Sequence, residues 1–171
     1  MSSDKTREIR VAKVTVNMGV GESGDALKTA QTILESITGA KSVQTKSKVR
    51  LPNWNIRPGL PIGAKTTLRH EKAMAFLKRA LLAKDNHLSP RSFDSRGNFG
   101  FGIREHIDLQ GVKYDPKIGV RGFDVLVALE RPGFRIARRK LRKSPVGSRH
   151  VISKSEGIAF VKVAFGVEVD E

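Results

Sequence analysis

Apolar and polar side chains alternate with a period of two in several segments, the pattern of strands that bury one face. In segment 9–18, Val14, Val16 and Met18 alternate with polar residues, and segment 61–69 repeats the alternation. Segments 41–50, 98–108 and 122–130 are also predicted to be strands. The pattern therefore predicts a protein built around a β-sheet.

Apolar residues at helical spacing predict three helices between and after these strands. They cover about 25–38, 71–84 and 154–165, and Ser153 and Glu156 have the spacing of a capping box at the start of the last one. Gly39 is placed to end the first helix. The order β-α-β-β-α-β-β-α favours an α+β fold. We expect a single domain over residues 1–171, with helices on one face of a largely antiparallel sheet.

The polar positions of three strands predict a second, helix-free face rich in cations and hydrogen-bonding groups. They are Lys13, Thr15 and Asn17; Gln44, Lys46, Lys48 and Arg50; and Lys65, Thr67 and Arg69. Phosphate contacts would supply affinity on such a face, while Thr, Asn and Gln reach sugars and base edges. The alternative is an ordinary solvated sheet face.

The charge of the chain favours a polyanionic partner. Its 171 residues include 32 Lys and Arg against 17 Asp and Glu, a net charge of +15. No acid occurs between Glu35 and Glu71 or between Glu130 and Glu156, although both stretches are rich in Lys and Arg. The chain has no cysteine, no apolar run long enough to span a membrane and no apolar leader. We therefore expect an intracellular protein that binds nucleic acid and has no membrane partner.

The segment 46–59, "KSKVRLPNWNIRPG", is predicted to be a stiff basic loop between the second and third strands. It holds four cations, no acid and the only tryptophan, and Pro52 and Pro58 prevent it from continuing the sheet. Two roles for Trp54 stay open: a hydrophobic plug at the base of the loop, or a platform on which an RNA base stacks.

A glycine-rich turn offers an alternative from another class, a nucleotide-binding enzyme. "GVGESG", from Gly19 to Gly24, matches G-x-G-x-x-G between a strand and a helix. The next strand, however, ends in "KSKVR" rather than in the acid that would hold a ribose, and the two following strands look like a hairpin. A tight backbone turn is the favoured interpretation.

The sequence predicts no metal site, cofactor or catalytic pair. His70, His87, His106 and His150 are scattered along the chain and show no ligand spacing. In "SFDSRGNFGFG", Asp94 and Arg96 are expected to form a pair that braces a loop. A free-standing DNA- or RNA-binding regulator remains a third alternative.

Several segments resemble, in order, the universal family of large-subunit ribosomal protein five, which binds 5S ribosomal RNA. They are "VAKVTVNMGVGES" (11–23), "TKSKV" with "NWNIRPGLPIGAKTTLRHE" (45–71), "SFDSRGNFGFGIREHI" (92–107) and "YDPKIGVRGFDV" (114–125). The short amino terminus and the basic segment 131–150 resemble the archaeal and eukaryotic branch. The resemblance implies a non-enzymatic protein of the cytoplasmic ribosome.

The resemblance also implies partners and sites. The protein would hold 5S rRNA against large-subunit rRNA in the central protuberance, beside other ribosomal proteins. Lys13, Asn17 and Thr67 match positions that bind 5S rRNA in the family, and the predicted 5S rRNA-binding set further includes Thr15, Lys41, Gln44, Lys65 and Arg69. The loop would contact peptidyl-site tRNA through Lys46, Lys48, Arg50, Asn53, Trp54, Asn55 and Arg57. Further rRNA contacts are expected from Arg138, Arg139, Lys140, Arg142 and Lys143, in a segment 131–150 that either orders on RNA or is mobile.

Two positions depart from the family pattern. Where the family often has Gln before the Lys that begins the second strand, this chain has Ala40, so that contact is lost or passes to Lys41 or Gln44. Where the family commonly has Phe in the loop, this chain has Trp54, which is still an aromatic ring.

Overall fold

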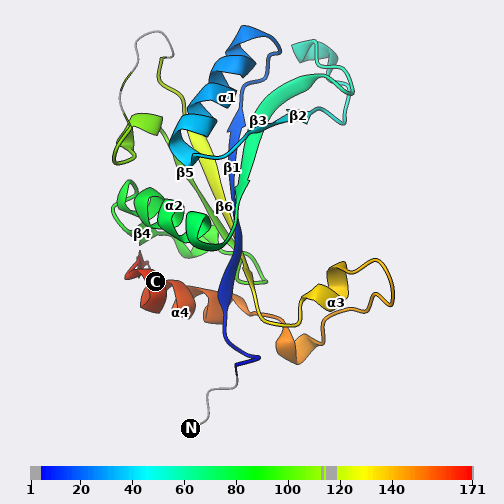
Figure 1. Cartoon of the computed structure of the whole chain (residues 1–171), viewed down its shortest axis with the longest axis vertical. Coiled ribbons are helices and arrows are strands. Elements are labelled where there is room, and N and C mark those ends of the chain that lie inside the picture. The colour runs from blue at the N-terminus through cyan, green and yellow to red at the C-terminus, as the bar shows by residue number, and fades with distance from the viewer. Residues whose placement is uncertain (1–4, 113, 115–118, 171) are drawn as a thin grey trace.

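The computed structural model describes residues 5–112, 114 and 119–170, and its centre is a five-stranded antiparallel sheet (Figure 1). The strand order is β2-β3-β1-β6-β5. The strands are β1 (Arg10–Gly19), β2 (Val43–Lys46), β3 (Pro61–Leu68), β5 (Phe99–Ile103) and β6 (Phe123–Glu130). The α+β fold with a largely antiparallel sheet is confirmed. Residues 115–118, part of the segment 114–125, lie outside the described residues.

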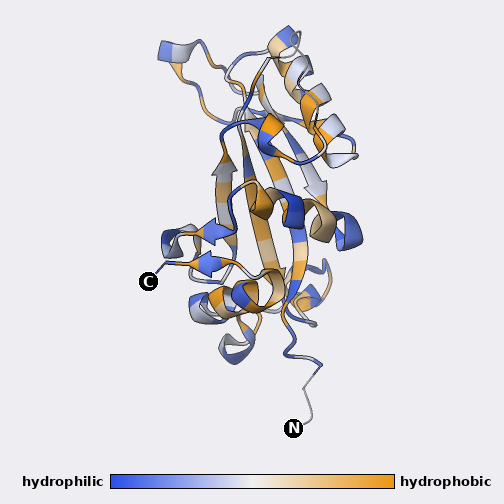
Figure 2. Ribbon diagram, turned by 90° about the vertical axis from the view of Figure 1, so that its left-hand side faces the viewer, coloured by the Kyte–Doolittle hydropathy of each residue, from blue (hydrophilic) through white to orange (hydrophobic). Residues whose placement is uncertain are grey.

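The helices α1 (Asp25–Thr38) and α2 (His70–Leu82) pack on one face of the sheet, α1 against β3 and α2 against β1. Both present an apolar stripe to the sheet, including Leu34 and Leu77, which are fully buried. The strands supply the other half of this core from alternate positions, such as Val14, Val16 and Val125. The alternation is visible as orange and paler bands along the strands in Figure 2.

The last helix, α4 (Lys154–Phe165), begins and ends where the sequence predicts. Ser153 accepts a hydrogen bond from the Glu156 amide, and the Glu156 carboxylate accepts one from the Ser153 amide, which completes the capping box. Gly166 ends the helix in the left-handed conformation. The Ser153 amide and the Arg131 guanidinium hold the pKa of the Glu156 carboxyl below its usual value.

Two strands are shorter than predicted and two were missed. Alternation over 41–50 continues past Lys46, but Pro52 and a β-bulge between Thr45 and Lys46 limit β2 to four residues. The strand predicted over 98–108 ends at Ile103, because the chain then turns into a 3-10 segment over His106–Asp108. The missed strands, β4 (His87–Leu88) and β7 (Glu168–Val169), pair in parallel and are too short to show a period.

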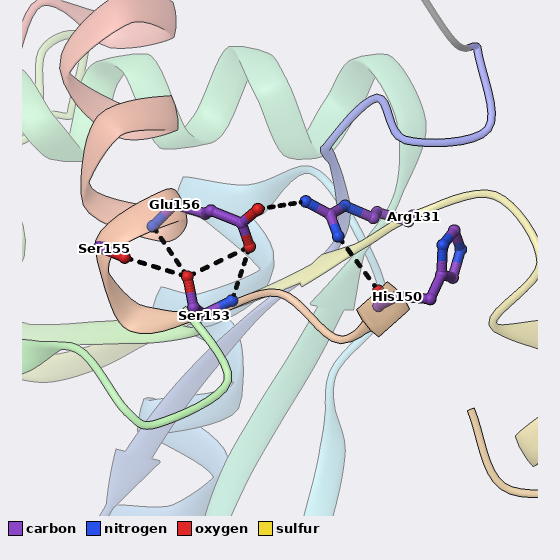
Figure 3. A network of polar contacts seen from close by, with 5 residues as sticks. All are labelled: Arg131, His150, Ser153, Ser155 and Glu156. Atoms are coloured by element: carbon purple, nitrogen blue, oxygen red, sulfur yellow. Dashed lines mark hydrogen bonds and ion pairs between the residues drawn. The ribbon is translucent and has the colours of Figure 1, made fainter. Parts of the chain in front are cut away.

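The basic segment 131–150 is folded against α4 through a network around Arg131 (Figure 3). It contains the short helix α3 (Arg135–Arg138) and a 3-10 turn over Ser148–His150. The buried Arg131 guanidinium donates hydrogen bonds to the His150 carbonyl at 3.3 Å and to the Glu156 carboxylate at 2.8 Å. A buried guanidinium requires such partners, so this network fixes both ends of the segment.

Candidate nucleic-acid interface

The sheet face opposite α1 and α2, called the open face below, carries two parallel rows of polar residues. Thr15 of β1 lies opposite Thr67 of β3, and Asn17 lies opposite Lys65. Paired residues of antiparallel strands point to the same face, and their neighbours Val16 and Thr66 are buried on the helix side. The predicted grouping of Lys13, Thr15, Asn17, Lys65 and Thr67 on one face is therefore confirmed.

The other half of the open face is different in character. On β6, Asp124 lies opposite Asn17 and the half-exposed Leu126 lies opposite Thr15, while Gly100 and Gly102 of β5 complete the register. Because the glycines lack side chains, a hollow of about 700 Å³ lies over β5 and β6, with Lys13 and Thr15 among its lining residues. The open face thus has a cationic half on β1 and β3 and a shallow, nearly neutral half.

Sequence reasoning missed the neutral half, although the signal was available. Asp124, Leu126 and Ala128 alternate with the buried Val125 and Val127, so the period of two places them on the open face. The prediction of this face considered strands with cationic positions and therefore left out the acid Asp124 and the exposed Leu126.

The placement of Gln44 on the open face is wrong. Gln44 pairs with the buried Ala64, on the side of the helices, and its amide donates a hydrogen bond of 3.0 Å to Gln31 of α1. Val43 and Thr45 take the open-face positions, opposite Lys65 and Gly63. Gln44 was assigned to the open face because it is polar. In an edge strand such as β2, however, residues on the helix side also reach solvent and can be polar. Lys41 precedes β2 and Arg69 follows β3, and both are exposed.

The loop between β2 and β3 is a structured hairpin tip rather than a continued strand. Lys48 and Arg50 lie beyond the end of β2, so their predicted place in a strand row is wrong. Leu51 and Ile56 exchange backbone hydrogen bonds of 2.9 and 3.1 Å, and a 3-10 turn over Pro52–Trp54 lies between them. The candidate residues are nevertheless all exposed: Lys46, Lys48, Arg50, Asn53, Trp54, Asn55 and Arg57.

Trp54 does not plug the base of the loop. Its side chain is 72% exposed, whereas Ile56 is only 7% exposed and closes the loop base instead. An indole this exposed on a protein surface is available for stacking. The structure therefore removes one of the two roles that the sequence left open.

The candidate residues of segment 131–150 differ in how they are held. Arg138 forms an ion pair with Glu130, and the Arg139 Nε donates a hydrogen bond of 2.7 Å to the Arg142 carbonyl. Lys140, Arg142 and Lys143 are exposed between α3 and the 3-10 turn. This region therefore presents a dense cationic surface on a folded support.

The glycine-rich turn does not have the geometry of a dinucleotide site. In the sheet β3 lies between β1 and β2 and is antiparallel to both, so β1 and β2 run in the same direction but are not hydrogen-bonded neighbours, unlike the adjacent strands of a dinucleotide-binding β-α-β unit. Gly21 and Gly24 have positive φ values of 83° and 109°, which only glycine adopts readily. The turn interpretation is the one that the geometry supports.

Asp94 braces its loop, but not through the expected pair with the Arg96 side chain. Its carboxylate accepts hydrogen bonds of 2.8 Å from the backbone amides of Arg96 and Asn98, and one of 2.9 Å from the Asn98 side chain.

Among the described residues, no three His, Cys, Asp or Glu side chains come together as metal ligands, and no helix is long and apolar enough to cross a membrane.

Comparison with known protein families identifies the family of the chain. A family model that describes the C-terminus of the ribosomal protein L5 family matches residues 61–160, and one described as ribosomal protein L5 matches residues 5–57. The chain belongs to the ribosomal protein L5 family. As a member of that family it is a structural constituent of the large ribosomal subunit in the cytoplasm and not an enzyme, and its expected partners are the ribosome and rRNA.

Several relatives that are similar over nearly the full chain come from archaea. The large ribosomal subunit protein uL5 of Nanoarchaeum equitans is 52% identical over 164 residues, which cover 95% of this chain and 96% of the relative. The uL5 proteins of Methanococcus aeolicus and Pyrobaculum aerophilum are 48% and 46% identical; the matches cover 95% and 96% of this chain, and 91% and 92% of those relatives. The archaeal type expected for this L5 protein is therefore confirmed.

Proposed function

We propose that the open face of this L5 protein binds 5S rRNA and thereby holds it against large-subunit rRNA in the central protuberance, among other ribosomal proteins. The observation that carries the proposal is the pair of rows on β1 and β3, which combine Lys13 and Lys65 with the short polar side chains of Thr15, Thr67 and Asn17 on a face that α1 and α2 leave uncovered. Membership of the L5 family supports 5S rRNA as the partner.

The two kinds of side chain have different roles in this proposal. Lys13, Lys41, Lys65 and Arg69 attract phosphates and supply affinity that depends on salt. Thr15, Asn17 and Thr67 offer donors and acceptors of fixed position, since their strands are hydrogen-bonded on both sides. Gln44 is not part of the proposed surface, because it faces α1.

We propose a second contact, between the loop tip and peptidyl-site tRNA. The tip combines exposed cations with an exposed indole on a short backbone-bonded turn. Such a surface suits an RNA backbone and an accessible base or sugar face. It protrudes from the end of the sheet in Figure 1, away from α2 and α4.

Asn17→Ala and Thr67→Ala should each weaken 5S rRNA binding roughly tenfold, the effect of losing one hydrogen bond to a charged or buried RNA group. Trp54→Ala should leave this affinity nearly unchanged, because Trp54 lies on the loop tip and not on the open face. A gel-shift titration with 5S rRNA, with transfer RNA as the competitor, measures both. Equal losses for Thr67→Ala and Trp54→Ala would contradict the assignment of 5S rRNA to the open face.

Arg57→Ala should spare 5S rRNA binding and lower the retention of peptidyl-site tRNA on reconstituted ribosomes. Arg57 is exposed at the tip, and its side chain makes no hydrogen bond or ion pair within the described residues, so its removal should not disturb the fold. The matched control is Lys72→Ala, which removes one exposed cation from α2 on the far side of the sheet. Normal tRNA retention by the Arg57 variant would remove the proposed role of the loop.

A further inference from the structure

A hollow lined by arginines lies where β1 begins and β6 ends. Its volume is about 220 Å³, and its charged lining residues are Arg10, Glu130, Arg131, Arg135 and Arg138. Four guanidinium groups around one carboxylate form a cationic site even after Glu156 is counted as the partner of Arg131. None of the expected RNA-binding residues except Arg138 lies in this hollow.

The hollow continues the open face. Glu130 follows the buried Leu129 and therefore has the same orientation as Asp124, Leu126 and Ala128 along β6. Arg10 lies opposite Glu130 in the register, and Lys13 follows after a β-bulge, opposite Ala128. An RNA that covers Lys13 and Thr15 would therefore reach the mouth of the hollow without leaving the sheet.

The carboxylate of Glu130 arranges two of the arginines before any ligand is present. Its Oε1 accepts hydrogen bonds from Nε and Nη2 of Arg10, at 3.2 and 2.9 Å, and its Oε2 accepts one from Nη2 of Arg138. The Glu130 side chain is only 13% exposed, whereas the Arg10 and Arg138 side chains are more than half exposed. Each guanidinium has five N–H donors, so donors of both arginines remain for a second anion.

Arg135, unlike Arg10 and Arg138, is not paired with Glu130: in the part of the chain that the structure describes, its side chain makes no hydrogen bond or ion pair. It is exposed on α3, three residues before Arg138 and therefore on the same side of the helix turn. Arg131 also lines the hollow, and its buried Nε has no hydrogen-bond partner among the described atoms. The site thus has cationic donors in excess of its single acid.

We infer that this hollow, formed by Arg10, Arg135 and Arg138 around Glu130, is a phosphate subsite that takes a backbone phosphate of the 5S rRNA lying on the open face. A phosphate oxygen pair matches the fork of a guanidinium, and Arg135 and Arg138 supply two such forks. Glu130 stays in place as the group that orients Arg10 and Arg138. The inference rests on the proposed 5S rRNA function and adds a site at the base of segment 131–150.

The test compares two double variants with equal loss of charge in 5S rRNA binding. Arg135→Ala/Arg138→Ala should weaken binding at least tenfold, while Lys72→Ala/Lys78→Ala, on the exposed side of α2, should weaken it far less. Phosphate-ethylation interference on 5S rRNA should show one or two positions that matter to the wild type and to the α2 variant but not to the arginine variant. Arg135→Ala alone, which leaves the pairs of Glu130 intact, should show part of both effects.

The remaining outcomes are distinguishable. If the wild type does not prefer 5S rRNA over tRNA, the proposed function itself fails. If the wild type binds 5S rRNA but the arginine and α2 variants bind equally well with the same interference pattern, the subsite is wrong and the function stands. Inorganic phosphate, titrated at constant ionic strength, tests whether the hollow binds free phosphate, which would shift the arginine Nε–H NMR signals. Such a shift with unchanged 5S binding would assign the hollow to free phosphate and overturn the inference.

Discussion

The complex of this protein with 5S rRNA should lose about 10³–10⁵-fold in affinity when monovalent salt rises from about 50 to 200 mM. This range corresponds to roughly six to ten neutralised phosphates, each of which releases condensed counterions. The open face and the arginine hollow together offer that number of cations, among them Lys13, Lys41, Lys65, Arg69, Arg135 and Arg138. The dependence of log Kd on log salt, measured by filter binding, gives the slope directly.

Charge-matched variants make this salt prediction specific to a surface. Lys13→Ala/Lys65→Ala should lower the slope by about 1.4–1.8, since each lost phosphate contact contributes about 0.7–0.9. Lys72→Ala/Lys78→Ala removes the same charge from α2 and should leave the slope nearly unchanged. A slope near zero for the wild type, or equal changes for the two variants, would contradict binding through the open face.

The fold could be predicted well wherever the sequence is periodic and long. In β1 the alternation of Val14 and Val16 with Thr15 and Asn17 reports burial on one face, so both the strand and the orientation of its side chains could be predicted, whereas its pairing with β3 could not. The capping box of Ser153 and Glu156 identified the first turn of α4 for a local reason, since both partners lie within four residues.

The wrong or missing predictions concern residues whose orientation or pairing depends on tertiary neighbours. Gln44 is polar but faces α1, because at the sheet edge a glutamine on that helix can bond it. Ile56, not Trp54, closes the loop, because the 3-10 turn of Pro52–Trp54 points the indole outward, and no periodicity reports such a turn. The strands β4 and β7 have two residues each, and their parallel pairing joins segments about eighty residues apart.

The arginine hollow also could not be predicted from the sequence, because it is formed by residues from distant segments. The sequence identifies segment 131–150 as basic, but nothing local indicates that Arg10, far away at the start of β1, shares Glu130 with Arg138. The β1–β6 register brings Arg10 to Glu130, and α3 brings Arg138 to the same carboxylate. Charge counting thus predicts the class of partner, while the topology decides where the charges meet.

The contact between Gly97 and Gly157 is the feature of the fold that is most sensitive to a single added methyl group. A Cβ on Gly157 would lie 2.7 Å from both Cα and O of Gly97, and a Cβ on Gly97 would lie 2.8 Å from the Ile152 side chain. Asp94 and its backbone hydrogen bonds hold the loop that carries Gly97, so the loop cannot withdraw without losing them. The close approach joins α4 to the sheet beside Arg131 and Glu156.

Gly157→Ala should therefore lower the free energy of unfolding by about 2 kcal/mol. Overpacking against backbone costs about 3 kcal/mol, while the higher helix propensity of alanine returns about 1 kcal/mol. The measurement is the midpoint and slope of urea unfolding, followed by circular dichroism. The control is Gly147→Ala, where φ is −57° and no atom lies within 4 Å of an added Cβ, so stability should stay unchanged or rise by about 0.4–1 kcal/mol. A Gly157 variant as stable as the wild type would show that the loop around Gly97 yields to the added methyl group.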